Sequence, residues 1–462
     1  MATNAPAAPE RHLGVFDAIA IVVGIVIGSF IFFLGPFLVA RNATSPTVMM
    51  LAWVMGGVLC LCGALSYAEL TTTYPKVGGE YFYLTRAFGS AVGFLFVWAR
   101  STVIQTGSIA LLAYVFGKNL TRLIYGDIPQ GSLSPMFFAL VATAVLTAIN
   151  VAGWRMGKWT QNTLTVSKVI GVLAIIVIGA TLAPAAGPGD ANAPMGTDIP
   201  WFGYAMVFVL LTFGGWSEAA YVAGEVRDAK RNMVKVMVGS ILVITALYLV
   251  ANLVYLRALG FHGLRSNPAI AAQTVANGVG KWGGDAITIL IALSALGAVN
   301  GCMFTGARAI YAMGTDFKAF RFLGCWNARL GTPARATILQ SLIAMVLIVI
   351  PNLGKGFQKA FGPDVQSLVD YTAPVFWIFV LLTGVGVFVL RAKDRDIERP
   401  YRVPLYPIPV VLFILMCGFM VYSSVAYTKL FALVGVGVLA LGVPLALVLG
   451  RRAPEPNSGT GN

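Results

Sequence analysis

The sequence is poor in charged residues. Only 11% of its 462 residues are Asp, Glu, Lys or Arg, whereas 58% are hydrophobic and the mean hydropathy is +0.81. A soluble protein carries roughly 25% charged residues, and a folded chain of this length cannot hide so large an apolar excess in its core. The composition therefore excludes a soluble protein and predicts an all-α integral membrane protein.

Side chains that bind metals or form disulfides are also scarce. The histidines are His12 and His262, and neither lies near a cysteine. The five cysteines are Cys60, Cys62, Cys302, Cys325 and Cys417. Four of them lie within apolar runs. Cys60 and Cys62 are two residues apart, which is closer than the usual spacing of zinc ligands. We expect buried thiols, no metal site and no cofactor.

The motifs of metallopeptidases and ATP-driven pumps are missing. The sequence contains neither H-E-x-x-H nor G-x-x-x-x-G-K-[ST], the motifs that hold a catalytic zinc ion and a nucleotide phosphate. We therefore expect no enzyme activity and no ATP-driven transport. A secondary transporter, a channel and a sensor stay open.

Long apolar runs dominate the chain. A helix needs about 20 apolar residues to cross the hydrocarbon core. The runs predict about twelve transmembrane helices, with centres near Val26, Met55, Thr102, Val145, Ala174, Leu211, Val243, Leu296, Met345, Leu381, Ile414 and Val438.

The surplus of basic residues indicates the orientation. Lys and Arg outnumber Asp and Glu by 32 to 18. With twelve spans, three basic clusters fall on the side of the N-terminus: Arg227, Lys230, Arg231 and Lys235; Arg308, Lys318, Arg321, Arg329 and Arg335; and Arg391, Lys393, Arg395, Arg399 and Arg402. Cytoplasmic loops are rich in Lys and Arg. The pattern predicts a multi-pass protein of the plasma (cell inner) membrane with both termini cytoplasmic.

Two of the predicted helices are interrupted by glycine. The first contains Gly24 and Gly28, and the sixth contains Gly214 and Gly215 at its middle. They are corresponding members of two five-helix halves, a pattern that indicates a binding site at the membrane midplane. A restarting half-helix presents N–H groups to a carboxylate, and a half-helix that stops presents carbonyls to an ammonium group. Such a site suits a zwitterion such as an amino acid.

Four stretches resemble a known family. They are GIVIGSFIF (24–32), YAEL followed by YPKVGGEYFYL (67–84), FGGWSEAAYVAGEV (213–226) and GAVNGCMFTGARAIYAMG (297–314). The chain resembles the amino acid–polyamine–organocation superfamily of secondary transporters, especially its L-type amino acid transporter-like branch, from about residue 13 to about residue 452.

The resemblance implies a fold and a division of the chain. It implies five plus five helices in an inverted repeat (the LeuT-like fold) with two helices appended, and transport by alternating access. The corresponding ranges are a tail at 1–12, a first repeat at 13–183, a second repeat at 200–391, two further helices at 404–450 and a tail at 451–462.

The resemblance also implies substrate-binding positions. Gly28 and Ser29 match a carboxylate cradle next to Val26, and Phe30 stands where the family usually has glycine. Leu211 stands where L-type transporters carry an aromatic gate, and we hypothesise that Phe30 supplies the missing bulk. The unwound part of the family's sixth helix is matched by Phe213, Gly214, Gly215 and Trp216. In the predicted eighth helix, Asn300 faces either the substrate or a neighbouring helix.

Charged residues inside the spans are the candidates for ion coupling. Lysine at mid-membrane is costly and usually functional. Lys168 stands where sodium-independent relatives place an ammonium group in the sodium site, which implies sodium-independent transport. Glu218 is a candidate proton carrier, and Arg100 is expected to pair with Glu218, Glu69 or Glu225.

The expected activity is transport of amino acids by exchange or linked to protons. Neutral amino acids are favoured because no carboxylate is evident deep in the site. No nucleic acid and no disulfide-linked partner are expected, since no cysteine is predicted on the outside. The alternatives are a transporter of another small amine or organic solute, or a channel or sensor with the same fold.

Overall fold

The computed structural model describes residues 11–32, 34–126, 132–185, 199–350, 367–428 and 430–449. The predicted C-terminal tail (451–462), most of the N-terminal tail (1–12) and most of the 184–200 loop lie outside the described residues.

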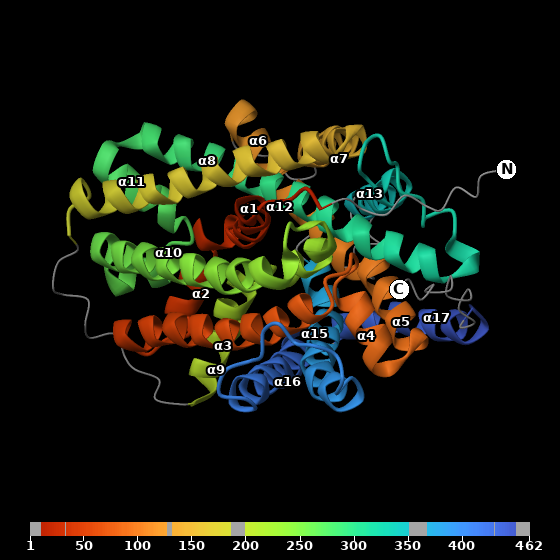
Figure 1. Cartoon of the computed structure of the whole chain (residues 1–462). Helices are drawn as coiled ribbons and strands as arrows, with labels where there is room; N and C mark the ends of the chain where they lie inside the picture. The colour runs from red at the N-terminus through yellow and green to blue at the C-terminus, as the bar shows by residue number, and fades with distance from the viewer. Residues whose placement is uncertain are drawn as a thin grey trace.

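The described residues form a bundle of helices, most of them running along one common direction (Figure 1). They contain two isolated bridges and no strand, which confirms the all-α prediction. The helices before residue 182 are α1 (Val15–Val26), η1 (Ser29–Phe32), α2 (Leu34–Arg41), α3 (Pro46–Thr73), α4 (Glu80–Phe88), α5 (Ser90–Ala99), η2 (Arg100–Ile104), α6 (Gln105–Tyr125), α7 (Ser134–Ala152) and α8 (Trp154–Thr181). The later ones are α9 (Ile199–Thr212), η4 (Trp216–Glu225), α10 (Ala229–Ser266), α11 (Ile270–Val279), α12 (Lys281–Asp316), η5 (Lys318–Phe320), α13 (Ala334–Val349), α15 (Ser367–Lys393), α16 (Ile408–Thr428) and α17 (Leu430–Leu449).

Membrane-crossing helices account for most of the described chain. Nine described segments are long and apolar enough to cross a membrane, and three shorter apolar helices add to them (Val15–Val26, Ala334–Val349 and Gly435–Val448). The multi-pass prediction is therefore confirmed, while the number of twelve spans stays a prediction.

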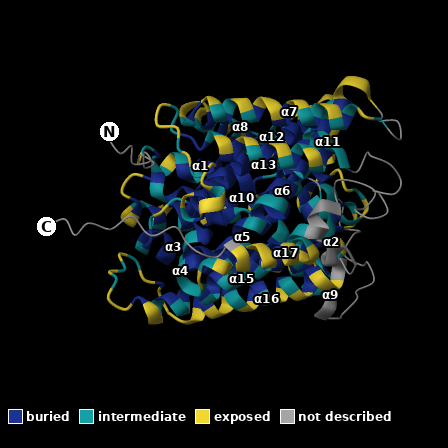
Figure 2. Cartoon of the chain, turned by 90° about the vertical axis from the view of Figure 1, so that its right-hand side faces the viewer, coloured by how far each residue is buried: buried dark blue, intermediate teal, exposed yellow. Residues whose placement is uncertain are grey.

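The apolar side chains point outward as well as inward. Exposed residues lie on the outer faces of the bundle (Figure 2), and many are large and apolar, such as Leu51, Val177 and Leu415. Lys168, Asn300 and Arg100 are buried instead. Large exposed apolar surfaces are unfavourable in water, so this arrangement fits a protein surrounded by lipid.

Both predicted helix interruptions are present. The helix α1 ends at Val26, η1 begins at Ser29, and α2 follows. The helix α9 ends at Thr212, and the chain resumes at Trp216 as the 3-10 helix η4. The element α1 packs against η4 and α2 packs against α9, so the two interrupted helices lie side by side.

The segment before α1 is joined to the end of η4. Leu13 N–H donates to the Glu225 carbonyl at 2.9 Å, and the Leu13 carbonyl accepts from Arg227 N–H at 2.9 Å. This short parallel bridge between Leu13 and Val226 holds the starting end of one interrupted helix against the finishing end of the other.

The short helix α4 is anchored to the end of α15. The Arg86 guanidinium binds both carboxylate oxygens of Asp394, at 2.5 and 2.9 Å, and the Tyr74 hydroxyl donates to Asp394 at 2.6 Å. The Arg86 guanidinium holds the pKa of the Asp394 carboxyl below its ordinary value. A depressed carboxyl pKa stabilises the fold above the unfolded-state pKa, and that contribution is lost as pH falls through the folded-state pKa.

Candidate functional site

The two helix breaks touch at Gly215. This residue has a φ of +101°, and a Cβ added to it would lie 2.6 Å from Ile25 Cγ2. Glycine adopts positive φ readily, and other residues rarely do. The absence of a side chain at residue 215 therefore allows the turn between α9 and η4 and its close approach to the end of α1.

Lys168 binds the first break from α8. Its side chain is completely buried, and its ammonium group donates a hydrogen bond to the Gly24 carbonyl. Gly297 on α12 leaves room for the lysine, because a Cβ there would lie 2.7 Å from Lys168 Cε. Lys168 thus joins α8 to the last turn of α1.

Two further side chains bind carbonyls of the first break. The Tyr248 hydroxyl, on α10, lies 2.8 Å from the Val26 carbonyl and 3.3 Å from the Thr212 carbonyl, so its single proton serves both breaks. The Ser294 hydroxyl donates to the Ile27 carbonyl at 2.9 Å. The backbone oxygens of Gly24, Val26 and Ile27, near the end of α1, are thus bound by protein side chains.

The predicted carboxylate cradle, Gly28 to Phe30, follows the end of α1 in the chain. Gly28 lies between α1 and η1, and its N–H donates to the Val26 carbonyl at 2.7 Å. Ser29 is buried, whereas Gly28 and Phe30 are partly exposed. The first N–H groups of a helix lack partners within that helix, so the start of η1 offers donors beside the bound carbonyls.

The aromatic residues around the second break point into the core. The Phe213 ring packs against Tyr248 with a centroid separation of 5.1 Å. The Trp216 ring packs against Tyr67 at 5.0 Å. Both side chains are buried, whereas Leu211 is partly exposed.

Asn300 contacts neighbouring helices. Its amide oxygen accepts from Asn150 at 2.8 Å, and its amide nitrogen donates to Gln161 at 2.9 Å. These bonds join α12 to α7 and α8. Of the two interpretations that the sequence leaves open for Asn300, the helix-to-helix contact is the one with bonds in the structure.

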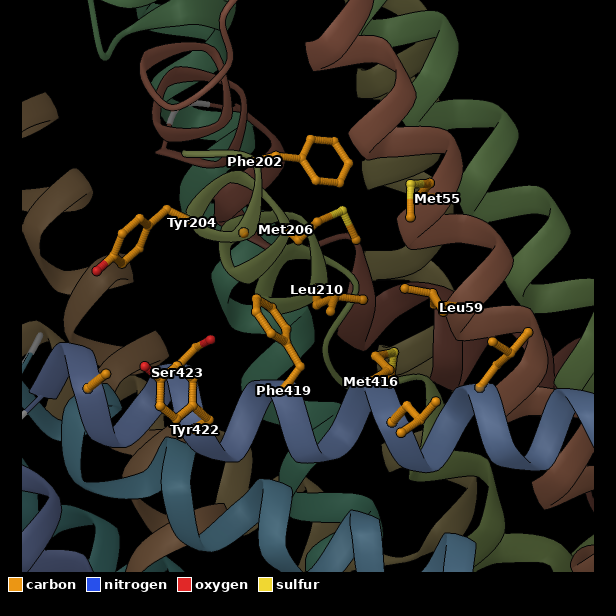
Figure 3. A pocket seen from close by; sticks show the side chains of 14 residues that line it. Met55, Leu59, Phe202, Tyr204, Met206, Leu210, Met416, Phe419, Tyr422 and Ser423 are labelled. Carbon is orange, nitrogen blue, oxygen red and sulfur yellow. The ribbon is translucent and has the colours of Figure 1, made fainter. Parts of the chain in front are cut away.

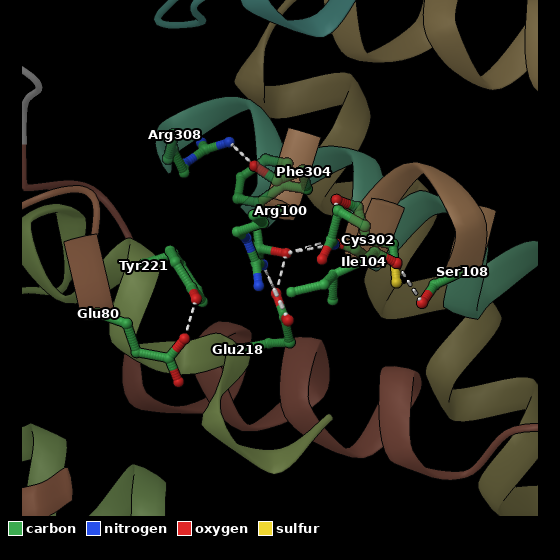
Figure 4. Close-up of polar contacts among 12 residues, drawn as sticks. Glu80, Arg100, Ile104, Ser108, Glu218, Tyr221, Cys302, Phe304 and Arg308 are labelled. Atoms are coloured by element: carbon green, nitrogen blue, oxygen red, sulfur yellow. Dashed lines mark hydrogen bonds and ion pairs between the residues drawn. The ribbon is translucent and has the colours of Figure 1, made fainter. Parts of the chain in front are cut away.

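Arg100 pairs with Glu218 inside the bundle (Figure 4). One guanidinium nitrogen lies 2.9 and 2.7 Å from the two carboxylate oxygens, and both residues are buried. Arg100 begins η2, a π-helical segment, and such segments are frequent at functional sites. The Thr305 hydroxyl also donates to Glu218.

We expect Arg100→Met to destabilise the protein strongly, because it leaves the Glu218 carboxylate buried without a cation. Removing one partner of a buried ion pair costs about 3–5 kcal/mol. Adding Glu218→Gln should recover much of the loss in thermal unfolding of the purified protein in detergent. The control is Arg86→Met, since Arg86 is partly exposed and such pairs contribute about 0–1 kcal/mol. An equal loss in both single variants would contradict the assignment.

Glu69 and Glu225 form ion pairs nearer the helix ends. Glu69 binds Arg391 and Arg399, and Glu225 binds Arg308, with a nitrogen–oxygen distance of 2.5 Å. Arg308, which the sequence analysis counts in a basic cluster with loop residues, is buried on α12 instead.

A hollow on the outer surface lies beside the second break (Figure 3). It is lined by fourteen residues of α3, α9 and α16. Tyr422, Leu415 and Met55 on its rim are exposed, and its lining contains no charged side chain. The hollow therefore faces lipid and lacks the groups that bind a zwitterion.

The sequence reasoning missed Tyr248 and Ser294. Both are polar residues within long apolar helices, and that isolation was the available signal. It also did not single out Glu80, although Glu80 follows two glycines inside the motif YPKVGGEYFYL.

Comparisons with known proteins agree on one family. The profile of a family described as amino acid permease matches residues 13–441. The b(0,+)-type amino acid transporter 1 of Mus musculus is 30% identical over 420 residues, which are 90% of this chain and 83% of that protein. The Homo sapiens protein of the same name is 31% identical over 407 residues, 87% of this chain and 80% of that protein. The large neutral amino acids transporter small subunit 2 of Rattus norvegicus is 28% identical over 448 residues, 94% of this chain and 80% of that protein.

Proposed function

Because the chain belongs to the amino acid permease family, we propose that it is a secondary transporter of amino acids, with neutral amino acids as its main substrates. Transport proceeds by alternating access across the plasma membrane, by exchange or linked to protons, and without sodium. Both termini are cytoplasmic in this proposal, as the distribution of Lys and Arg predicts.

The observation that carries the proposal is the contact between Lys168 and the first helix break. A fully buried ammonium group binds the Gly24 carbonyl, so a positive charge is already present among the backbone oxygens where α1 ends. A sodium ion at the same oxygens would be repelled at close range in a medium of low dielectric constant. This charge supports transport that needs no sodium.

The two breaks supply complementary groups for a zwitterion. The N–H groups of Ser29 and Phe30, at the start of η1, are suited to the substrate carboxylate. Backbone carbonyls near Thr212 are suited to the ammonium group, and the partly exposed Leu211 and Phe30 are suited to contact an apolar side chain. Gly214, Gly215 and Val26 shape the backbone around the substrate, and Phe213, Trp216 and Asn300 support it.

No disulfide-linked partner is part of the proposal. Cys60, Cys62, Cys302 and Cys417 are buried, and the exposed Cys325 lies between η5 and α13 in a loop that we assign to the cytoplasm.

Counterflow into proteoliposomes preloaded with a mixture of neutral amino acids tests the proposal. Radiolabelled alanine, leucine, glutamate and arginine are added singly outside. We expect saturable accumulation of a neutral label that depends on the internal amino acids. A channel would show no saturation at modest concentration and no need for preloading, and an enzyme would alter the label. No accumulation of any label would overturn the proposed function.

A further inference from the structure

A buried carboxylate, that of Glu80, joins α4 to η4, the second part of the interrupted sixth helix. Glu80 is the first residue of α4 and is 1% exposed. One of its oxygens accepts from the Tyr67 hydroxyl on α3, and the other accepts from the Tyr221 hydroxyl on η4. Figure 4 shows Glu80 and Tyr221 facing each other. We name these three residues the Glu80 latch.

The backbone beside Glu80 packs directly on η4. The Gly78 N–H donates to the Tyr221 carbonyl at 3.3 Å. A Cβ on Gly79 would lie 2.8 Å from the backbone carbon of Ala220. Any movement of η4 away from α3 and α4 must therefore break both this packing and the bonds of the Glu80 latch.

The Glu80 latch also contacts the second helix break. The Tyr67 ring packs edge-on against Trp216 with a centroid separation of 5.0 Å, and Trp216 follows Gly215 directly. On the other side, the Arg100 guanidinium lies 3.8 Å from the centroid of the Tyr221 ring. The Glu80 latch is thus joined through its two tyrosine rings to Trp216 and to Arg100.

Glu80 differs from the other buried carboxylates because it lacks a cation of its own. Glu69, Glu218 and Glu225 each form an ion pair with arginine, whereas no ion pair among the described residues includes Glu80. An ionised carboxylate that is buried without a paired cation is costly. Among the buried glutamates that the structure describes, Glu80 is therefore the one with the strongest reason to bind a proton.

The groups around Glu80 come from five elements. The titratable and charged side chains that face it are Tyr67 on α3, Tyr83 on α4, Arg100 on η2, Glu218 and Tyr221 on η4, and Cys417 on α16. Burial raises the pKa of the Glu80 carboxyl, while Arg100 and the two tyrosine hydroxyls oppose that rise. The net direction is upward.

We propose that Glu80 is a proton-binding site that couples protons to amino acid transport, by weakening the Glu80 latch when it is protonated. This inference rests on the proposed function and takes Glu80 rather than Glu218 as the proton carrier, because Glu218 already forms an ion pair with Arg100. The ionised carboxylate accepts charge-assisted bonds from both hydroxyls, and such bonds are roughly twice as strong as neutral ones. A bound proton removes that charge and frees η4 to leave α3 and α4.

Accumulation driven by a pH gradient tests the coupling. Proteoliposomes that are acidic outside and contain no amino acid receive the labelled substrate found by counterflow. If one proton moves with each substrate, one pH unit supports about tenfold accumulation. Glu80→Gln mimics the protonated group, so it should keep exchange and lose this accumulation. Glu69→Gln is the control, because Glu69 forms ion pairs with Arg391 and Arg399 and lies outside the Glu80 latch, and it should still accumulate substrate.

Two further measurements test the proposal even if Glu80→Gln fails to fold. Tyr67→Phe removes one donor to the carboxylate, so the midpoint of the pH dependence of exchange should move to higher pH. Infrared difference spectra of the wild type between acidic and neutral pH should contain a carboxylic acid band, and in Tyr67→Phe this band should appear at higher pH.

Gradient-driven accumulation by Glu80→Gln at the wild-type level would overturn the proposal. A wild-type protein that exchanges amino acids but accumulates none under the pH gradient would overturn it equally. A wild-type protein that exchanges no amino acid would instead overturn the proposed function, and the infrared band would still decide whether Glu80 binds a proton.

Discussion

Replacing Lys168 with alanine is expected to lower amino acid counterflow by about 100-fold, the largest effect of any single charge in the bundle. The variant loses a charge-assisted hydrogen bond and leaves the Gly24 carbonyl without its partner. Together these effects cost about 3 kcal/mol, and about 1.4 kcal/mol corresponds to a factor of ten in rate. Initial rates of counterflow at equal amounts of reconstituted protein give the measurement.

Lys158→Ala is the matched control for this prediction. Lys158 also joins α8 to α1, through Asp17 at 3.3 Å, but it is partly exposed. Such pairs contribute about 0–1 kcal/mol, so counterflow should fall by no more than about fivefold. Wild-type rates in Lys168→Ala would show that the lysine is not needed at the first break.

Replacing Gly215 with alanine is expected to reduce both stability and transport. Alanine at a φ of +101° costs roughly 1–2 kcal/mol. Its Cβ would also lie 2.6 Å from Ile25 Cγ2, and overpacking of this kind costs about 1–3 kcal/mol. The two breaks must move apart to relieve the contact, so counterflow should fall by at least about tenfold. Thermal unfolding and counterflow are measured on the same preparation.

Gly239→Ala controls for the loss of a glycine. Gly239 lies on α10, and the nearest atom to an added Cβ is Ile19 Cδ1 at 4.0 Å. Alanine is favoured over glycine within a helix by about 0.5–1 kcal/mol, so this variant should be as stable as the wild type or slightly more stable. Equal behaviour of Gly215→Ala and Gly239→Ala would contradict the role assigned to the turn at Gly215.

The sequence predicted the parts of the site that depend on local chemistry. Glycine pairs marked both helix breaks because glycine disfavours a continuous helix. A lone lysine in an apolar run marked Lys168 because an unpaired charge in lipid is costly. The all-α class and the membrane location followed from hydrophobic composition for the same reason.

The remaining features depend on packing between distant segments. The segment after Gly215 winds as a 3-10 helix with about three residues per turn, so Trp216 turns toward Tyr67 and Phe413. The sequence left the partner of Arg100 undecided, because several glutamates were candidates. In the structure Arg100 begins a π-helical segment and its side chain pairs with Glu218. Glu80 required the meeting of α3, α4 and η4, which no local pattern encodes.

The most direct test of the central claim is counterflow of a labelled neutral amino acid by the wild-type protein, with sodium replaced by choline on both sides of the membrane. The Lys168 ammonium group at the Gly24 carbonyl predicts equal initial rates in the two media. A collapse of counterflow in choline would contradict the account, because a sodium ion rather than the lysine would then supply the positive charge at the first helix break.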